Sequence, residues 1–222
     1  MNFQNYFIKP TFQQYFLICF FALLILLETL NLHLLMNYAE YFFIIIALII
    51  FYFLLIGLNS LEKKKLILSM LGFNIVLFLT IFFAKINGNI FGEFVYLDRS
   101  KITFFEVPLF IVLNYTLILF ASFYVVSNFL KNAWSNILGG GILTFFFNFT
   151  FEAIVEKYDW YVWTDYFRMN WGGIPLQNYL AWFIIGLISS IGIYYLKIKL
   201  EPKILITLWF AEIFTFQILL LI

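Results

Sequence analysis

Charged residues are scarce in this chain of 222 residues, since Asp, Glu, Lys and Arg together make up 11% of it. Soluble domains carry about 25% charged and about 45–50% apolar residues, whereas this sequence is 64% hydrophobic and 23% aromatic. A water-soluble fold of this length could not bury so much apolar surface. The shortage of charge therefore excludes an ordinary soluble domain and predicts a protein that is dissolved in lipid.

Cysteine and histidine are almost missing, with Cys19 and His33 as the single residue of each type. One cysteine excludes an intramolecular disulfide and a cysteine-based zinc site, and one histidine excludes a multi-histidine metal centre. We therefore expect no metal site. The net charge of +1 lacks the basic excess that is typical of nucleic-acid binding, so we expect no nucleic-acid partner.

Long apolar runs are abundant, and about 20 such residues suffice for a helix to cross a bilayer. The N-terminal stretch MNFQNYFIKP lacks the pattern of a cleaved signal peptide, so the first run is expected to be a membrane span. Backbone in lipid must satisfy its own hydrogen bonds, which favours helices. We predict an all-α, polytopic transmembrane helix bundle of about seven spans, forming a single integral membrane domain over residues 1–222. The expected spans are 13–31, 40–58, 66–84, 106–130, 137–156, 175–196 and 204–222.

The loops set the expected orientation. Eight lysines fall on the N-terminal side of the predicted spans and five lysines or arginines on the other side, which favours a cytoplasmic N-terminus. The two long connections, 85–105 and 157–174, then share the outer side, and both are rich in aromatic and acidic residues. This asymmetry predicts that chemistry or recognition lies toward the outer half of the bundle. Gly139, Gly140 and Gly141 predict a close helix contact.

Ionisable and amide side chains inside the spans are costly in lipid and mark functional candidates. Asn148 and Glu152 are four residues apart, so they share one helix face. Burial in an apolar bundle favours the neutral form of a carboxyl, so Glu152 could donate a proton while Asn148 orients it. A structural role is the alternative for Glu152. For Glu156, at the helix end, we expect a solvated interfacial acid.

Glu106 and Asn114 form a second candidate pair, eight residues apart on one predicted helix face, with Pro108 in the first turn. The alternative is that Glu106 is an N-terminal acid facing the helix dipole. Glu212, near the middle of the last span, is expected to form a hydrogen bond between helices. We expect Glu28 and His33 to be interfacial.

Aromatic residues crowd the second long connection. An interfacial aromatic belt explains some of them, but not the W-x-x-W spacing beside an acid pair. Aromatic faces also stabilise a nearby cation, so this cluster beside a protonated carboxyl suits chemistry that makes a carbocation. The residues are Tyr158, Trp160, Tyr161, Trp163, Tyr166 and Trp171.

Two adjacent amides, Gln177 and Asn178, stand just before the sixth apolar run. They could simply cap the helix. Alternatively, Pro175 sets the helix start, Asn178 faces the site with Trp182 one turn further on, and the amides position a water molecule without competing for a proton.

Several of these segments together resemble the membrane carotenoid biosynthesis protein family, whose characterised members include γ-carotene and bisanhydrobacterioruberin hydratases. The resemblance covers roughly residues 66–196, and its most specific part is the block PLQNYLAWF from Pro175 to Phe183. The other segments are Gly88 with F-G-x-x-x-Y at Phe91–Tyr96, V-P-L at Val107–Leu109, L-N at Leu113–Asn114, Asn148-x-x-x-Glu152 and Trp160-x-x-Trp163. Three positions depart from the family pattern: Ile81 stands where an acid is usual, Asn148 where aspartate is common, and Tyr115 where tryptophan is common.

The resemblance implies a cofactor-free addition of water to the terminal double bond of an acyclic carotenoid end. The catalytic candidates are then Glu152, Asn148 and Glu106. The substrate-binding candidates are Tyr96, Asn114, Trp160, Trp163, Pro175, Gln177, Asn178 and Trp182. The expected partners are membrane lipid, a carotenoid substrate and other carotenoid enzymes, and the expected location is a prokaryotic cytoplasmic membrane.

Other functions stay open at this point. A carotenoid end-group cyclase or isomerase would share the carbocation and lack only the capture of water. A non-catalytic membrane protein that binds a carotenoid or lipid is a second class. A small transporter would be expected to show repeats or paired broken helices, and the sequence shows neither.

Overall fold

The computed structural model describes residues 11–30, 34–88, 90–97, 100–164, 170–171, 173–198 and 200–222. The helices are α2 (Phe12–Thr29), α3 (Leu34–Leu55), α4 (Ser60–Asn87), α5 (Leu109–Phe129), α6 (Ala133–Lys157), α7 (Leu176–Leu196) and α8 (Lys203–Leu221). The short strands are β1 (Phe94–Tyr96), β2 (Thr103–Phe104), β3 (Val107–Pro108), β4 (Tyr161–Trp163), β5 (Asn170–Trp171) and β6 (Ile174–Pro175).

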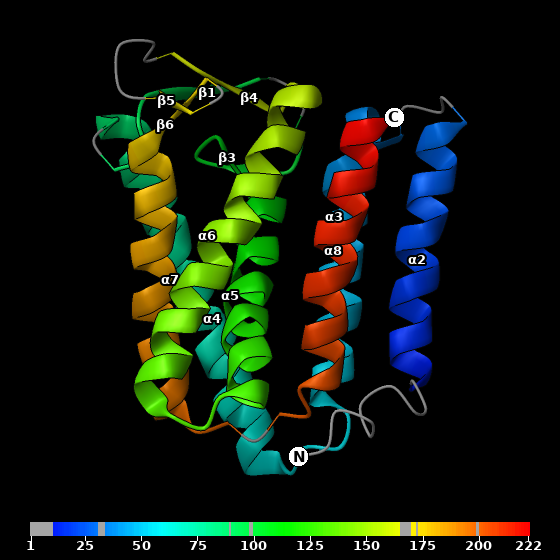
Figure 1. Cartoon of the computed structure of the whole chain (residues 1–222), viewed down its shortest axis with the longest axis vertical. Coiled ribbons are helices and arrows are strands. Elements are labelled where there is room, and N and C mark those ends of the chain that lie inside the picture. Colours follow the sequence, from blue (N-terminus) through cyan, green and yellow to red (C-terminus); the bar gives the residue numbers. More distant parts are fainter. Residues whose placement is uncertain are drawn as a thin grey trace.

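The helices run side by side as a bundle (Figure 1). Six of them are long and apolar enough to cross a membrane, and the remaining helix, α3, has an apolar stretch over Glu40–Leu55. The predicted all-α bundle is therefore confirmed, and the protein is an integral membrane protein.

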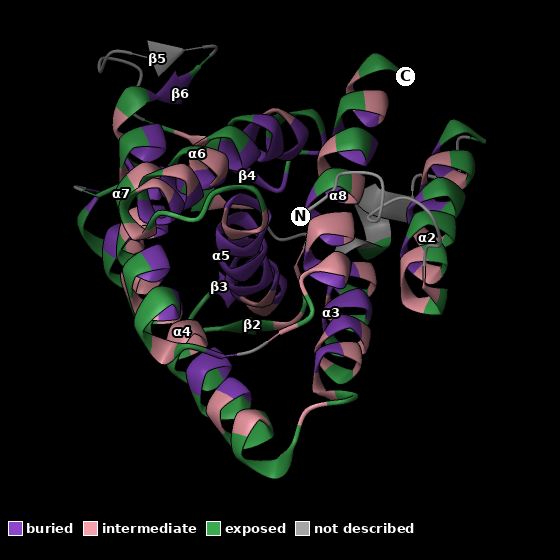
Figure 2. Cartoon of the chain, turned by 60° about the horizontal axis from the view of Figure 1, so that its bottom comes forward, coloured by how far each residue is buried: buried purple, intermediate pink, exposed green. Residues whose placement is uncertain are grey.

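Helix α5 lies at the centre of the bundle, with α3, α4, α6, α7 and α8 packed around it (Figure 2). Its sequence, LFIVLNYTLILFASFYVVSNF, carries no charged residue, and its side chains are buried from Phe110 to Val126 apart from the half-buried Leu113. A helix that is apolar all round is the kind that a protein can surround on every side.

Helices α6 and α7 meet along a seam of small residues. A methyl group built on Gly186 would lie 2.7 Å from the Cβ atom of Thr144 and 3.0 Å from the Cα atom of Gly141. Gly140 and Gly141 face α7 in the same way, through Ser190 and Leu187. The close contact predicted from the glycine triplet is confirmed.

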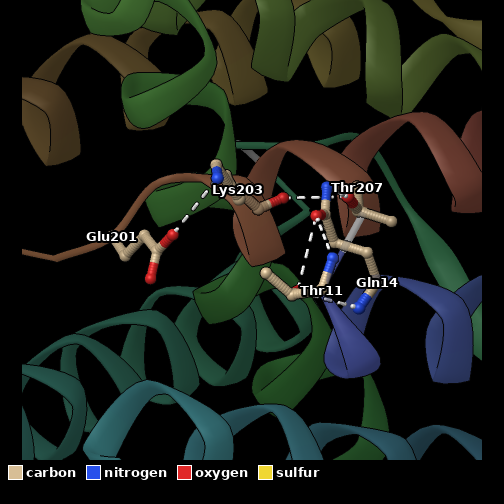
Figure 3. Close-up of polar contacts among 5 residues, drawn as sticks. All are labelled: Thr11, Gln14, Glu201, Lys203 and Thr207. Atoms are coloured by element: carbon tan, nitrogen blue, oxygen red, sulfur yellow. Dashed lines mark hydrogen bonds and ion pairs between the residues drawn. The ribbon is translucent and has the colours of Figure 1, made fainter. Parts of the chain in front are cut away.

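Polar contacts hold α2 against α8 near the end of the bundle where both helices begin (Figure 3). The Gln14 amide donates to Thr207 Oγ1 at 3.0 Å, and the Thr207 hydroxyl donates to the Lys203 carbonyl at 2.9 Å. Thr11 and Gln14 also form a capping box at the start of α2, which satisfies amide groups that the first helical turn leaves free.

The two long connections meet at the opposite end of the bundle, which is also where the chain ends (Figure 1). Strand β1 from the first connection pairs antiparallel with β4 from the second, and Tyr96 lies opposite Tyr161. The prediction that both connections lie on one side of the bundle is therefore confirmed. Strands β5 and β6 form a further antiparallel pair before α7.

Glu106 does not begin a helix, so that prediction is wrong. Strands β2 and β3 form a tight hairpin, and its two turn residues, Phe105 and Glu106, have φ angles of 46° and 61°. Helix α5 begins only at Leu109, with Pro108 as its N-cap. The hairpin forms because the left-handed backbone of a two-residue turn matches the twist of paired strands.

Candidate functional site

A buried carboxyl lies at the centre of the candidate site. The Glu152 side chain on α6 is 1% exposed. Its Oε1 atom accepts a hydrogen bond from the Asn178 amide at 2.9 Å, and its Oε2 atom accepts one from the Tyr161 hydroxyl at 2.8 Å. The side chains of Trp163 and Asn148 lie close to the same carboxyl.

These donors come from three separate parts of the chain. Asn178 lies in the first turn of α7, which begins directly after Pro175. Tyr161 and Trp163 are held by β4, which pairs with β1. Burial away from water favours the neutral carboxylic acid, whereas donated hydrogen bonds favour the carboxylate. These two effects oppose each other at Glu152.

Asn148, one helical turn before Glu152, is fully buried. Its Oδ1 atom accepts a hydrogen bond from the Tyr115 hydroxyl of α5. The Tyr115 ring in turn stacks on Trp182 of α7, with 3.8 Å between the ring centroids and 13° between the planes. Helices α5, α6 and α7 are thus linked at the level of the carboxyl.

A cavity lies next to this polar cluster. Its lining is Ile81, Phe91, Phe94, Tyr96, Ile111, Tyr115, Tyr161, Trp163, Asn178 and Trp182. The space open to the centres of water molecules is about 20 Å³, which is room for about one water. Seven of the ten lining residues are aromatic, so a molecule in this cavity is surrounded mainly by ring faces and edges.

The aromatic wall is tightly interlocked. Phe94 contacts Tyr96, Tyr161 and Trp163 with ring centroids 5.3, 5.6 and 5.4 Å apart. On the other side, Phe91 stacks on Trp182 at 5.3 Å. Such rings present negative π faces that attract a cation.

The tyrosines of this wall hold their protons. Burial, and then the nearby Glu152 carboxyl, raises the pKa of Tyr161 and of Tyr96 well above the ordinary phenol value. Both side chains are therefore neutral phenols at physiological pH, able to donate one hydrogen bond and to accept others.

The amide pair Gln177 and Asn178 lies in the first turn of α7 and does not cap the helix, since Pro175 is the N-cap residue and no side chain caps α7. Gln177 instead donates to the carbonyl of Gly88 at 3.2 Å, while Asn178 turns inward to Glu152. Gly88 ends α4 with a φ of 61°. Nearby, a methyl group on Gly92 would lie 2.8 Å from Pro175. Gly88 and Gly92 are thus packed directly against the IPLQN segment.

The remaining candidates from the sequence lie outside the cavity. Trp160 packs against Phe43 and Phe110 at 6.0 and 5.5 Å. Asn114 donates to Glu212 at 3.2 Å, which joins α5 to α8, so the expected hydrogen bond of Glu212 between helices is confirmed.

Glu106 and Glu156 are exposed, as we expected for Glu156. Glu106 is paired with Lys85, whose ammonium group lowers the pKa of the Glu106 carboxyl.

The structure therefore brings Glu152, Asn148, Asn178, Trp163, Trp182 and Tyr96 together, places Pro175 and Gln177 at the rim, and leaves Glu106, Asn114 and Trp160 elsewhere. His33 lies outside the described residues. Glu28 is buried in the last turn of α2, and its position at the membrane interface stays a prediction.

Sequence reasoning missed the roles of three polar residues. The sequence indicates Tyr161 only as a member of the aromatic cluster and Tyr115 only as a departure from the family pattern, because nothing in the sequence pairs either hydroxyl with a residue of α6. Glu40, at the start of a predicted span, is 4% exposed. Its Oε2 atom accepts hydrogen bonds from the Ser100 hydroxyl and from the backbone N–H groups of residues 101 and 102, all within 2.9 Å. Glu40 thus fastens the first long connection to α3.

A larger cavity, about 350 Å³, lies at the opposite end of the bundle. Thr11, Glu201 and Lys203 line part of it (Figure 3). The Lys203 ammonium is 3.7 Å from the Glu201 carboxyl, and both groups are partly in solvent. Among the described residues that line it, this cavity therefore has no buried acid or base that could do chemistry. Among the described residues, no group of three His, Cys, Asp or Glu side chains could hold a metal ion.

The bundle and this cluster define an integral membrane protein with a buried carboxyl beside an aromatic cavity. The chain belongs to the carotenoid biosynthesis protein family: the family model described as "Carotenoid biosynthesis protein" matches residues 15–219. No curated protein and no solved structure gives a significant match.

Proposed function

We propose that this protein adds water to the terminal double bond of an acyclic carotenoid end, without a cofactor, and that Glu152 supplies the proton. The observation that carries this proposal is the buried Glu152 carboxyl beside a cavity walled by seven aromatic rings. Protonation of a trisubstituted alkene gives a tertiary carbocation. An acid is needed to form this cation, and nearby aromatic faces stabilise it.

The cycle consumes no net proton. Glu152 loses a proton to the alkene carbon, water attacks the cation, and the proton lost by that water restores Glu152. A buried acid can therefore turn over without a proton path to bulk solvent, although one water molecule must enter the site in each cycle. The present space holds about one water, so the aromatic residues on β1 and β4 must move apart to admit the substrate end, as active-site loops commonly do.

The orientation proposed from the lysines places this site in the outer half of the membrane. The short connections at the opposite end then face the cytoplasm, as the positive-inside rule requires. A polyene dissolved in the bilayer could reach such a site from the side, and association with other carotenoid enzymes would shorten its path.

The test is co-expression in cells that make lycopene or γ-carotene, followed by mass analysis of the pigments. Hydration adds one water per modified end. Glu152→Gln keeps the shape and removes the acid, and we expect it to lower product formation by about 10²–10⁴-fold. Glu212→Gln is the matched control, because Glu212 is another fully buried glutamate paired with an asparagine, and it should keep the activity.

Each other outcome is informative once the protein is found in the membrane. A product of unchanged mass but altered structure would replace hydration by cyclisation or isomerisation. Unchanged pigments with the wild-type protein would refute hydration of these substrates and favour a non-catalytic role. Full activity of Glu152→Gln would eliminate Glu152 as the acid.

A further inference from the structure

The Glu152 carboxyl is not among the described residues that line the cavity. Each of its oxygen atoms is instead hydrogen-bonded to a side chain that does line it: Oε1 to Asn178 and Oε2 to Tyr161. Since Glu152 is 1% exposed, these two side chains separate it from any molecule in the cavity. Trp163 also lines the cavity close to the carboxyl, but its indole N–H is a donor only and cannot accept a proton. A proton that travels from Glu152 to a substrate must therefore pass Asn178 or Tyr161.

The two separating groups differ in chemistry. An amide nitrogen such as Asn178 Nδ2 donates hydrogen bonds but has no lone pair suited to accept a proton. A phenol such as Tyr161 accepts a hydrogen bond on its oxygen while it donates its own proton. The route through Tyr161 is therefore the one that chemistry allows.

We propose that Tyr161 relays the proton between Glu152 and the polyene carbon, so that its hydroxyl is the group that touches the reacting atoms. This inference rests on the proposed hydration. The Tyr161 hydroxyl donates to the Glu152 carboxylate; once Glu152 is protonated, this hydrogen bond reverses, so that the acid donates to the Tyr161 oxygen and the Tyr161 proton is free to point into the cavity. In the first step, the acid proton of Glu152 moves to the Tyr161 oxygen as the Tyr161 proton bonds to the alkene carbon, leaving a carboxylate and a carbocation. In the second, water bonds to the cation and gives a proton to the Tyr161 oxygen, and the Tyr161 proton returns to Glu152.

The surroundings of Tyr161 suit this role. Its ring is fixed by edge contacts to Tyr96 at 5.5 Å and to Trp163 at 5.7 Å. Burial raises the pKa of Tyr161, so the phenol keeps its proton between turnovers.

Other hydroxyl groups of the cavity are less well placed. The Tyr115 hydroxyl donates to Asn148 and not to the acid. Tyr96 lines the cavity, but among the described residues the hydroxyl that is hydrogen-bonded to Glu152 is that of Tyr161. We therefore assign the relay to Tyr161, because its hydroxyl is the one hydrogen-bonded to Glu152 among the described residues.

The decisive variant is Tyr161→Phe, which keeps the ring and its packing and removes the hydroxyl. We expect hydration to fall by at least about 10²-fold, with the protein still present in the membrane at wild-type level. Tyr158→Phe is the matched control, because Tyr158 is also a buried tyrosine of the same connection, lies beside a glutamate (Glu28), and does not line the cavity. It should hydrate as the wild type does.

A second measurement separates a relay from a residue that only positions Glu152. Hydration rates of isolated membranes in mixtures of H₂O and D₂O should depend quadratically on the deuterium fraction, because two protons move in the slow protonation of carbon. A linear dependence in an active wild-type protein would overturn the relay, as would an active Tyr161→Phe variant. A wild-type protein that forms no hydrated product would overturn the proposed function and the relay together.

Discussion

The seam between α6 and α7 allows a quantitative test of how the site is held together, through the change Gly186→Ala. The new methyl group would lie 2.7 Å from the Thr144 Cβ atom, 2.8 Å from its Oγ1 atom and 3.0 Å from the Gly141 Cα atom. The last neighbour is backbone and cannot rotate away. Helix α7 must therefore move away from α6.

Overpacking of this kind costs about 1–3 kcal/mol. Alanine also favours a helix over glycine by up to about 1 kcal/mol, which offsets part of that cost. Gly72→Ala on α4 measures the gain in helix propensity alone, because a methyl group at Gly72 meets nothing within 4 Å. The difference in unfolding free energy between the two variants should thus equal the clash itself, about 1–3 kcal/mol.

The assay is unfolding of the purified protein in mixed micelles by added dodecyl sulfate, followed by tryptophan fluorescence. Because Gly186 lies two turns after Asn178 on α7, the same shift should lengthen the hydrogen bond from Asn178 to Glu152 and reduce pigment conversion. Equal stability of the two alanine variants would refute the close packing that places α7 against Glu152.

Three further changes test other contacts. Glu40→Ala should cost about 1–3 kcal/mol, because it removes three partly buried hydrogen bonds between a carboxylate and the first long connection, and limited proteolysis should then cut that connection faster. Gln14→Ala removes the hydrogen bond to Thr207 and should lower the unfolding free energy by about 0.5–1.5 kcal/mol in the same micelle assay. For Glu106, Lys85 lowers the pKa of the carboxyl, so any stabilisation is present above the ordinary glutamate pKa and is lost as pH falls through the lowered value. Because this carboxyl is exposed, Glu106→Gln should leave the unfolding free energy at neutral pH unchanged, and a large loss there would contradict the surface placement.

The helices could be predicted from apolar run length, because lipid requires each span to satisfy its own backbone. Their ends were harder to place. Helix α4 was expected to begin at residue 66, yet it begins at Ser60, capped by the Asn59 side chain. The lysine triplet at 63–65 was assigned to a loop because of its charge, whereas charged side chains can extend from the first turns of a helix into the aqueous interface.

The buried carboxyl could also be predicted, since Glu152 and Asn148 share a helix face within an apolar run. The residues that donate hydrogen bonds to this carboxyl could not be predicted. Asn178 lies 26 residues further along the chain, and its inward direction depends on where α7 starts. Glu106 illustrates the opposite error: an acid beside an apolar run resembles a helix start, but the backbone turns left-handed at two residues and places the carboxyl at the surface.

The three departures from the family pattern become connected once they are placed in space. Ile81 and Tyr115 both line the cavity, and the Tyr115 hydroxyl is hydrogen-bonded to Asn148. An aspartate at position 148 would put a second carboxylate one helical turn from Glu152, where two like charges oppose each other's ionisation. With Asn148, the neighbour of Glu152 is a neutral amide whose oxygen is occupied by Tyr115. With Ile81, the cavity wall opposite the polar cluster is apolar. In the proposed mechanism the departures act together: they remove competing carboxyls and leave Glu152, reached through Tyr161, as the acid of the described site.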